Sequence, residues 1–328
     1  LLKRRRARTG LLNFILYLKP DYIVSDFARE TCAALDAFLE EMVAGLRPIL
    51  LLGAPPQHGK SEIVSRFFPA YAFGRFPNLR IGGLSYAFPL ATAMNRDVQR
   101  IMLSPEYHRL FPDSALNQRR VVTLEMEAKR NSEGFEIINH RGSYISQGVG
   151  GPLTGNALDL GIIDDPIKNA AEALSPTVKQ GIWDWYVSTF LTRLSKNSGQ
   201  IIMATRWAAD DLTGRVMEKY ARAKKLFFSA ITDGKALIPE LHPIEKLLET
   251  KATLGEYFWA ALYQQAPKPA GGNIIKDTWV QYYTVVPSKF EEVILSWDMT
   301  FKDTKGSDFV VGQVWGKVGA DAYLLDQL

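Results

Sequence analysis

The sequence predicts an α/β fold of the phosphate-loop NTPase class, with a mostly parallel central sheet. A glycine-containing segment at 53–61 lies between an apolar run at 49–52 and apolar residues at helical spacing over 63–71. A second strand-then-helix pattern spans 79–102, and a third apolar strand at 158–165 ends in two aspartates. Repeated strand–helix units favour parallel strands, whose carboxyl ends share one edge of the sheet.

The segment between the first strand and the first helix predicts a phosphate loop that binds ATP. Its backbone N–H groups and the positive end of the following helix would hold phosphate oxygens. Lys60 is expected to reach the β- and γ-phosphates, and the Ser61 hydroxyl to ligate Mg²⁺. The candidate nucleotide-binding residues are Gly53, Ala54, Pro55, Pro56, Gln57, His58, Gly59, Lys60 and Ser61.

The loop departs from the usual G-x-x-x-x-G-K-S spacing at one position. Ala54 stands where the first glycine is expected, and Gly53 precedes it. The alternative interpretation is a Gly/Pro-rich surface turn before a helix, but a Gly-Lys-Ser after a buried strand is uncommon by chance.

The acid pair Asp164–Asp165 predicts the second half of an ATPase site. Asp164 would hold the Mg²⁺ shell, and Asp165 would orient and deprotonate the attacking water as a catalytic acid–base group. Adjacent carboxylates repel, so a metal ion or a proton is needed to keep both there. An acid pair before proline is otherwise an ordinary start of a turn.

Two further strand ends carry candidate catalytic residues. Thr205 follows an apolar strand at 200–203, where a hydroxyl beside a nucleotide can sense the γ-phosphate. Asp298 ends an apolar strand at 292–296, where a metal-dependent nuclease would place an acid. An ordinary strand terminus and a turn-forming aspartate are the respective alternatives.

The composition fits an ordinary soluble protein of one large or two ordinary domains. The 328 residues include 47% hydrophobic and 23% charged residues, enough for sizeable cores. The net charge of +4 neither demands nor excludes nucleic acid. The single Cys32 fits a reducing compartment, and no apolar run approaches a membrane span. The missing initiator Met and the apolar final residues suggest a fragment.

A Pro/Gly-rich segment, APKPAGG at 266–272, predicts a linker between two domains. We expect an ATPase domain over 1–265, a linker over 266–275 and a second domain over 276–328. In the second domain, short loops between apolar strands favour an antiparallel sheet. We expect a basic arm at 1–8 to be a solvated tail, with contact to a phosphate or a partner as the alternative. Other expected elements are helices at 27–46, 176–194, 209–220 and within 233–262, and short strands at 121–127 and 135–145.

Several segments together resemble the large terminase subunit, the DNA-packaging motor of tailed bacteriophages. These segments are PPQHGKS at 55–61, SY at 85–86, GGPLTG at 150–155, IIDDPIK at 162–168, ATRW at 204–207, YQQ at 263–265 and SWD at 296–298. Each is modestly specific alone, whereas their order and spacing are highly specific.

The resemblance implies an ATPase domain followed by the truncated start of a ribonuclease H-like nuclease domain. Lys60, Ser61, Asp164 and Asp165 would carry ATP hydrolysis, with Thr205 in the motif that couples it to movement. Asp298 would be both catalytic and the first metal ligand of a nuclease that uses Mg²⁺ or Mn²⁺. The implied partners are double-stranded DNA, the portal protein and the small terminase subunit, with no membrane. A monomer in solution, a ring on the portal and the cytoplasm of the bacterial host cell are also implied.

Three departures from the family pattern affect these expectations. Gln57 stands where relatives often have Arg, and Asn156 where they often have Arg or His, so the charge-stabilising arginine is not obvious. Arg141, Arg206 or a neighbouring subunit could supply it. Asp165 stands where many motors have Glu. Few residues follow Asp298, so this chain is not expected to cut DNA. The alternatives are a helicase-like nucleic-acid remodeller and a nucleotide-binding scaffold with weak hydrolysis.

Overall fold

The computed structural model describes residues 2–117, 128–153, 155–268, 281–298 and 310–328. The chain divides into two compact units, Leu1–Asn273 and Ile274–Leu328. The expected boundaries at 1–265, 266–275 and 276–328 remain a prediction, since most of the linker lies outside the described residues. None of the helices in the described ranges is long and apolar enough to cross a membrane.

The first unit is built on a seven-stranded sheet in the order β3-β4-β2-β5-β6-β1-β7. Its strands are β1 (Ile49–Gly53), β2 (Arg80–Ser85), β3 (Gly134–Glu136), β4 (Ser143–Gly148), β5 (Leu158–Asp164), β6 (Leu194–Ala204) and β7 (Lys224–Phe227). Only the β3–β4 pair is antiparallel. The prediction of a mostly parallel α/β sheet is therefore confirmed, whereas β7 was not predicted.

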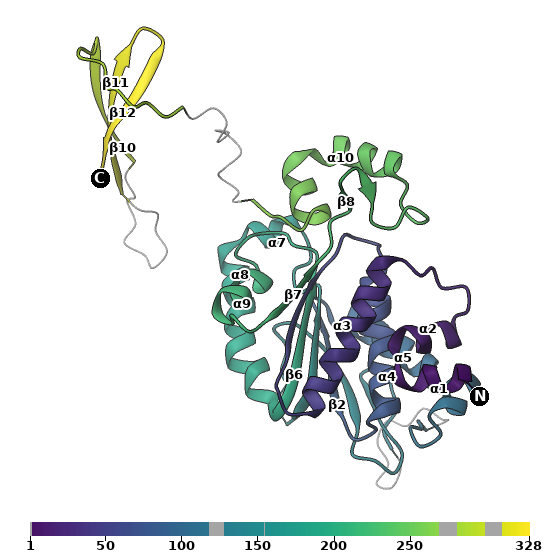
Figure 1. The fold of residues 1–328 in the computed structure, drawn as a ribbon. Helices are drawn as coiled ribbons and strands as arrows, with labels where there is room; N and C mark the ends of the chain where they lie inside the picture. Colours follow the sequence, from purple (N-terminus) through teal and green to yellow (C-terminus); the bar gives the residue numbers. More distant parts are fainter. Residues whose placement is uncertain (1, 118–127, 154, 269–280, 299–309) are drawn as a thin grey trace. The chain divides into compact units, whose positions relative to one another are not determined.

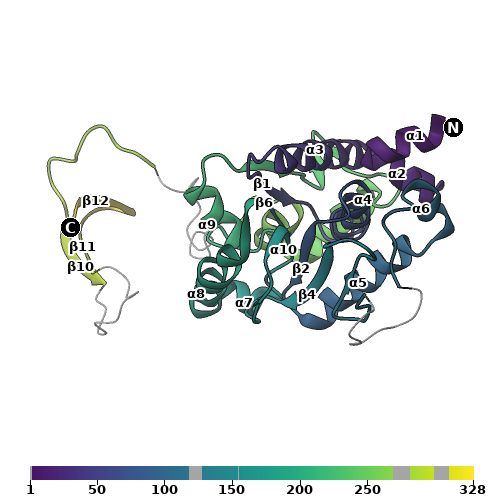
Figure 2. The same ribbon diagram turned by 90° about the horizontal axis from the view of Figure 1, so that it is seen from below.

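Helices cover both faces of this sheet (Figures 1 and 2). One face carries α3 (Asp26–Val43), α4 (Phe68–Arg75) and α5 (Phe88–Met102), and the other carries α7 (Ala170–Leu174), α8 (Pro176–Trp185) and α9 (Leu212–Lys219). Alternate residues of β1 enter the two cores: Leu50 and Leu52 belong to one, Ile49 and Leu51 to the other. A strand buried on both faces needs a continuous apolar run, which explains its sequence.

The N-terminal residues form a helix, α1 (Leu2–Thr9), followed by α2 (Leu11–Leu18). Ala7 is fully buried in the core cluster that includes Leu11 and Phe14, so the prediction of a solvated tail is wrong. Pro105, which interrupts the pattern after α5, occupies the first turn of α6 (Pro105–Leu110) behind the Ser104 cap. Proline is tolerated there because that N–H needs no helical partner.

Several helical segments include π-helical or 3₁₀ turns. The helix predicted at 176–194 is α8 continued by η2 (Tyr186–Phe190) and η3 (Leu191–Arg193). The last part of the first unit holds a small hairpin, β8 (Ile231–Thr232) with β9 (Lys235–Ala236), then α10 (Ile244–Phe258) and η4 (Trp259–Tyr263). Trp259 and Ala230 anchor this part in a small core of their own.

The second unit contains three strands, β10 (Glu292–Asp298), β11 (Val311–Val318) and β12 (Asp321–Gln327). Both pairs are antiparallel, as the sequence predicts. The strand predicted at 121–127 lies outside the described residues.

Candidate nucleotide-hydrolysis site

The predicted phosphate loop leaves the carboxyl end of β1 and enters a π-helical turn, η1 (Glu62–Phe67), that continues into α4. Gln57 and Gly59 adopt left-handed backbone angles, with φ of 60° and 87°. Ala54 is buried and is not among the residues with positive φ, so alanine is compatible with this position. The substitution for the usual glycine therefore costs the loop no backbone strain.

Lys60 points to the carboxyl end of β5, the strand that ends in the two aspartates. Its Nζ lies 3.2 Å from Oδ2 of Asp165, and its side chain is only 7% exposed. Strands β1 and β5 are separated in the sheet by β6, yet their carboxyl ends bring the lysine and the acid together. The structure thus joins two residues that the sequence predicts for one site.

Asp164, the last residue of β5, is 1% exposed and accepts hydrogen bonds from two hydroxyls. Ser61 Oγ lies 3.3 Å from Oδ1, and Ser65 Oγ lies 2.7 Å from Oδ2. Burial, and then the charge of Asp165, raise the pKa of Asp164. A buried carboxylate with a serine hydroxyl is an oxygen donor set that suits Mg²⁺, so these residues fit the metal.

Sequence reasoning missed Ser65. It lies four residues after Ser61, one helical turn along, and that spacing was the available signal. Ser85, at the end of β2, is register partner to Asp164 and is fully buried. Its hydroxyl has no hydrogen-bond partner among the described residues.

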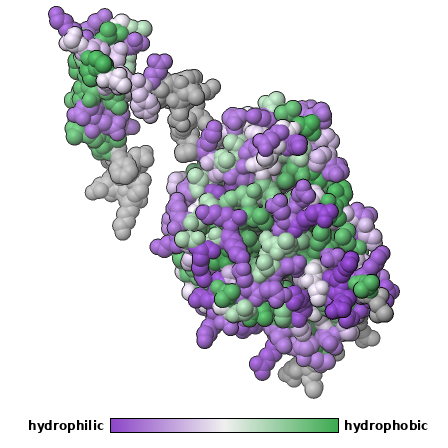
Figure 3. All heavy atoms as spheres, viewed as in Figure 1, coloured by the Kyte–Doolittle hydropathy of each residue, from purple (hydrophilic) through white to green (hydrophobic). Residues whose placement is uncertain are grey.

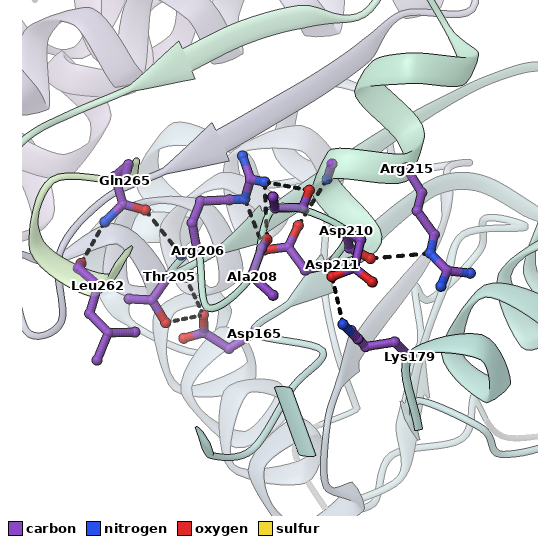
Figure 4. A network of polar contacts seen from close by, with 12 residues as sticks. Asp165, Lys179, Thr205, Arg206, Ala208, Asp210, Asp211, Arg215, Leu262 and Gln265 are labelled. Atoms are coloured by element: carbon purple, nitrogen blue, oxygen red, sulfur yellow. Dashed lines mark hydrogen bonds and ion pairs between the residues drawn. The ribbon is translucent and has the colours of Figure 1, made fainter. Parts of the chain in front are cut away.

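Asp165 is held in an uncommon conformation by contacts with its neighbours. Its φ is 46°, in the left-handed region that disfavours non-glycine residues. Its N–H donates to the carbonyl of Met203 (2.8 Å), and its own carbonyl accepts from the N–H of Tyr86 (3.2 Å). Its Oδ1 accepts from the Thr205 N–H (2.8 Å) and hydroxyl (3.4 Å), as Figure 4 shows. The carboxylate is therefore oriented by Thr205, the predicted coupling residue.

Arg206, one of the candidates for the charge-stabilising arginine, forms a buried ion pair with Asp211. Its Nε lies 2.8 Å from Oδ2 of Asp211, and both side chains are almost fully buried (5% and 4% exposed). Its Nη2 also donates to the carbonyls of Ala208 and Ala209, each at 3.2 Å (Figure 4). The structure does not bring Arg206 to the phosphate loop, which corrects that expectation.

Arg141, the other candidate, lies two residues before the start of β4 and is exposed. Because β4 is parallel to β2, whose carboxyl end lies beside Asp164, Arg141 occupies the opposite edge of the sheet. It is therefore far from the phosphate loop as well.

Gln265 is a further buried residue at this edge of the sheet. Its Oε1 accepts from the Arg206 N–H (3.2 Å), and its Nε2 donates to the carbonyl of Leu262 (2.6 Å), as Figure 4 shows. A Cβ on Gly53 would lie 3.0 Å from the same Oε1, so the backbone there approaches Gln265 closely. The side chain thus joins the end of β1 to the segment after η4, a contact that sequence reasoning missed.

Two histidines join the phosphate loop to the segment before α10. The rings of His58 and His242 stack with centroids 4.0 Å apart. His58 Nδ1 donates to the Pro56 carbonyl (2.8 Å), and His242 Nε2 donates to the Gln57 carbonyl (3.1 Å). Burial, followed by the nearby charges of His242 and Lys60, lowers the pKa of His58 to about 4. His242 carries no sequence signal for this contact.

Asp298, the predicted nuclease acid, ends β10 and lies opposite Val311 in the second unit. Asp326 lies opposite Val314, on the other neighbour of β11. The register therefore does not bring these two acids together. Within the described residues, no group of three His, Cys, Asp or Glu side chains could hold a metal ion.

Solved structures that resemble this chain include the large terminase of bacteriophage HK97 (TM-score 0.50, 13% identity; 97% of this chain and 67% of that chain). A second is the large terminase ATPase domain of Thermus phage P74-26 (TM-score 0.48, 13% identity; 70% of this chain and 96% of that chain). A third is the Phi-28 gp11 DNA packaging motor (TM-score 0.40, 9% identity; 87% of this chain and 77% of that chain). The chain spans about two thirds of the HK97 protein. Comparison with curated protein sequences finds no match.

The sequence also matches the family model described as terminase large subunit, T4likevirus-type, N-terminal. The match covers residues 51–282, which is 232 of 328 residues, or about 71% of the chain. It includes the phosphate loop, both aspartates and Thr205. This chain therefore belongs to the large terminase subunit family, and residues 51–282 correspond to the N-terminal domain of that family.

Proposed function

We propose that this chain is the ATPase part of a viral DNA-packaging motor, in which ATP hydrolysis drives double-stranded DNA into a procapsid. Family membership supports the role in packaging. The observation that carries the hydrolysis assignment is the meeting of Lys60 and Asp165 at 3.2 Å, beside the buried Asp164.

Each group at the sheet edge has a defined task in this proposal. The N–H groups of the loop and the ammonium of Lys60 hold and neutralise the β- and γ-phosphates. Asp164 and Ser61 would hold Mg²⁺, which when bound neutralises charge on phosphate oxygens. Asp165 accepts a proton from the water that attacks the γ-phosphate in line. The Asp165 side chain is short. Backbone hydrogen bonds with Met203 and Tyr86 fix the position of this residue and compensate for that length.

Thr205 is the proposed coupling residue. Its N–H and hydroxyl contact Asp165, while the N–H of the next residue, Arg206, contacts Gln265. A movement of Asp165 toward the γ-phosphate would therefore move Thr205 and Arg206, and through Gln265 the segment after η4.

The placement of Arg141 and Arg206 favours an arginine supplied by a neighbouring subunit. Neither side chain lies at the phosphate loop, so another group must stabilise the negative charge of the transition state. Slow hydrolysis by the isolated chain, as in a nucleotide-binding scaffold, is the expected consequence. Assembly from a monomer in solution into a ring on the portal would complete the site.

The remaining partners and the nuclease belong to the same proposal. Double-stranded DNA, the portal protein and the small terminase subunit would meet the motor in the cytoplasm of the bacterial host. Asp298 would be the first metal-binding acid of a ribonuclease H-like nuclease that uses Mg²⁺ or Mn²⁺. Because two-metal cleavage needs several converging acids, we expect this chain to leave plasmid DNA uncut, and cleavage in either metal would refute that.

The test is ATP turnover by the chain compared with Lys60→Ala and Asp165→Asn, each with and without double-stranded DNA. Both substitutions should remove most turnover, because one removes phosphate stabilisation and the other the proton acceptor. Stimulation by DNA would favour the motor, whereas strand separation of a forked duplex would favour the helicase-like alternative. Turnover that persists in Asp165→Asn would overturn the site assignment.

A further inference from the structure

The first helix, α1, is a dense positive surface whose charge the fold does not neutralise. Its eight residues contain five cations, which are Lys3, Arg4, Arg5, Arg6 and Arg8. All five are exposed, and none forms an ion pair within the parts of the chain that the structure describes. In Figure 3 this corner, near the N-terminus, is strongly hydrophilic.

The helix is a fixed part of the molecule. Ala7 is fully buried beside Leu11 and Phe14, and α1 packs on α2, α4 and α6. The guanidinium of Arg8 donates to the carbonyl of Arg109 (3.4 Å), a neutral acceptor. The backbone that carries these positive charges is therefore held in place before any partner arrives.

Helix stability explains only part of this positive charge. The negative end of the helix dipole favours Arg6 and Arg8 in the last turn, but it does not favour Lys3, Arg4 and Arg5. Like-charged pairs such as Lys3–Arg6 and Arg4–Arg8 lie at spacings where repulsion destabilises a helix. An arrangement that is unfavourable within the chain points to an external anion.

A hollow beside α1 gives this surface a shape as well as a charge. It has a volume of about 350 Å³ and is lined by Lys3, Arg6, Asn13, Leu16, Tyr17 and Pro20. Two cations, an amide and a phenol can all donate hydrogen bonds to phosphate oxygens. No carboxylate is found among the described residues that line it.

We propose that α1 and this hollow contact the phosphate backbone of duplex DNA, a proposal that rests on the motor function proposed above. A helix of eight residues is about 12 Å long, and about 12 Å of duplex axis carries about seven phosphate charges. Five exposed cations approach that density. Contacts of this kind are independent of base sequence, as a motor that moves along any DNA requires.

The test is the salt dependence of duplex binding by the full chain, measured with a labelled duplex of random sequence. The variant K3Q/R4Q/R6Q removes three charges while keeping residues of similar helix propensity. The matched control, K219Q/R222Q/K225Q, removes three exposed charges around the end of α9 and β7, none of which forms an ion pair among the described residues. We expect the slope of log affinity against log salt to fall by about two to three in the α1 variant, and by less than about one in the control.

Each outcome decides the proposal. Equal slopes in the α1 variant and the unmodified chain would overturn it, and α1 would then fit a protein partner. Equal losses in the variant and the control would show a general effect of charge and overturn it too. ATP turnover without DNA, compared with Lys60→Ala, tests the hydrolysis assignment separately. The α1 variant should retain that turnover because α1 contributes no residue to the hydrolysis site.

Discussion

The Nζ of Lys60 lies 3.2 Å from Oδ2 of Asp165, so the loop lysine and the acid expected to activate water neutralise each other. Lys60 therefore has two competing anionic partners, this carboxylate and the phosphates of a nucleotide. Asp165 also has a second set of partners, because Thr205 holds its other oxygen. We therefore expect substitutions of Lys60 and of Asp165 to have opposite effects on ATP affinity.

Asp165→Asn should bind ATP more tightly than the unmodified chain while losing most hydrolysis. The substitution releases Lys60 from its partner, and a partly exposed ion pair is worth about 1 kcal/mol, or about fivefold in affinity. Equilibrium titration with a fluorescent ATP analogue measures the effect. Lys60→Ala is the control and should weaken binding. Weaker ATP binding by Asp165→Asn would show that the two groups do not compete.

Asp164→Asn should raise the stability of the protein measured without Mg²⁺ and nucleotide. Burial raises the pKa of Asp164, so the charged form of this carboxyl is costly in the folded protein. Each tenfold change in the proton dissociation constant corresponds to about 1.4 kcal/mol. The neutral amide avoids that cost. Its advantage should grow as the pH rises from the ordinary aspartate pKa of about 4 to the raised pKa, because over that interval the unfolded carboxyl is charged while the folded carboxyl still holds its proton. Above the raised pKa both states are charged, so the advantage should stay constant there.

Urea unfolding at about pH 4.5 and about pH 8, which span most of the interval between the unfolded and the raised pKa, checks this prediction. Adding Mg²⁺ with ATP should stabilise the unmodified chain but have little effect on Asp164→Asn. An Asn variant that is less stable at both pH values would mean that the hydrogen bonds from Ser61 and Ser65 outweigh the buried charge.

The β1 loop and the β5 acids were predictable because burial on both faces imposes a continuous apolar run. The apolar runs at 49–52 and 160–163 end in residues whose type identifies the chemistry, and parallel strands place those ends together. The α1 helix was missed because its many charges resemble a solvated arm, while only Ala7 and the following residues reveal the packing.

The rest of the site depends on contacts between residues distant in sequence. His58 and His242 are 184 residues apart (242 − 58), and Gln265 meets Arg206 from 59 residues away. The sequence shows that Arg206 is positively charged, but not that it forms a buried ion pair with Asp211. Arg141 was misplaced because its edge of the sheet depends on the direction of β4, which only strand pairing reveals.

Arg206→Met should destabilise the protein by about 3–5 kcal/mol, because it leaves the buried Asp211 without its cation. The double variant Arg206→Met/Asp211→Asn should recover part of this loss. The asparagine introduced at position 211 would still accept the N–H of Gly214 in the first turn of α9, so the helix cap is kept. Denaturant unfolding of the two variants gives the comparison, and a double variant less stable than Arg206→Met would count against a buried ion pair.

His58 should make the protein less stable as the pH falls from about 6.5 to about 4. The pKa of His58 is about 4 in the folded chain, against about 6.5 when unfolded. Above about pH 6.5 the ring is neutral in both states, so its contribution is constant there. Between the two values the unfolded chain binds a proton that the folded chain does not, and stability falls by about 3 kcal/mol in total. Below about pH 4 both states are protonated and the decline from this ring ends.

The measurement is the free energy of unfolding of the unmodified chain and of His58→Gln, at several pH values between about 7.5 and about 4. Glutamine does not titrate, so the difference between the two curves isolates the histidine from the carboxylates that also change in this range. That difference should change by about 3 kcal/mol across the interval, in favour of the glutamine variant at the acid end. Parallel curves would mean that His58 accepts its proton in the folded protein, and the stacked ring of His242 and the nearby Lys60 would then not oppose its charge as the packing implies.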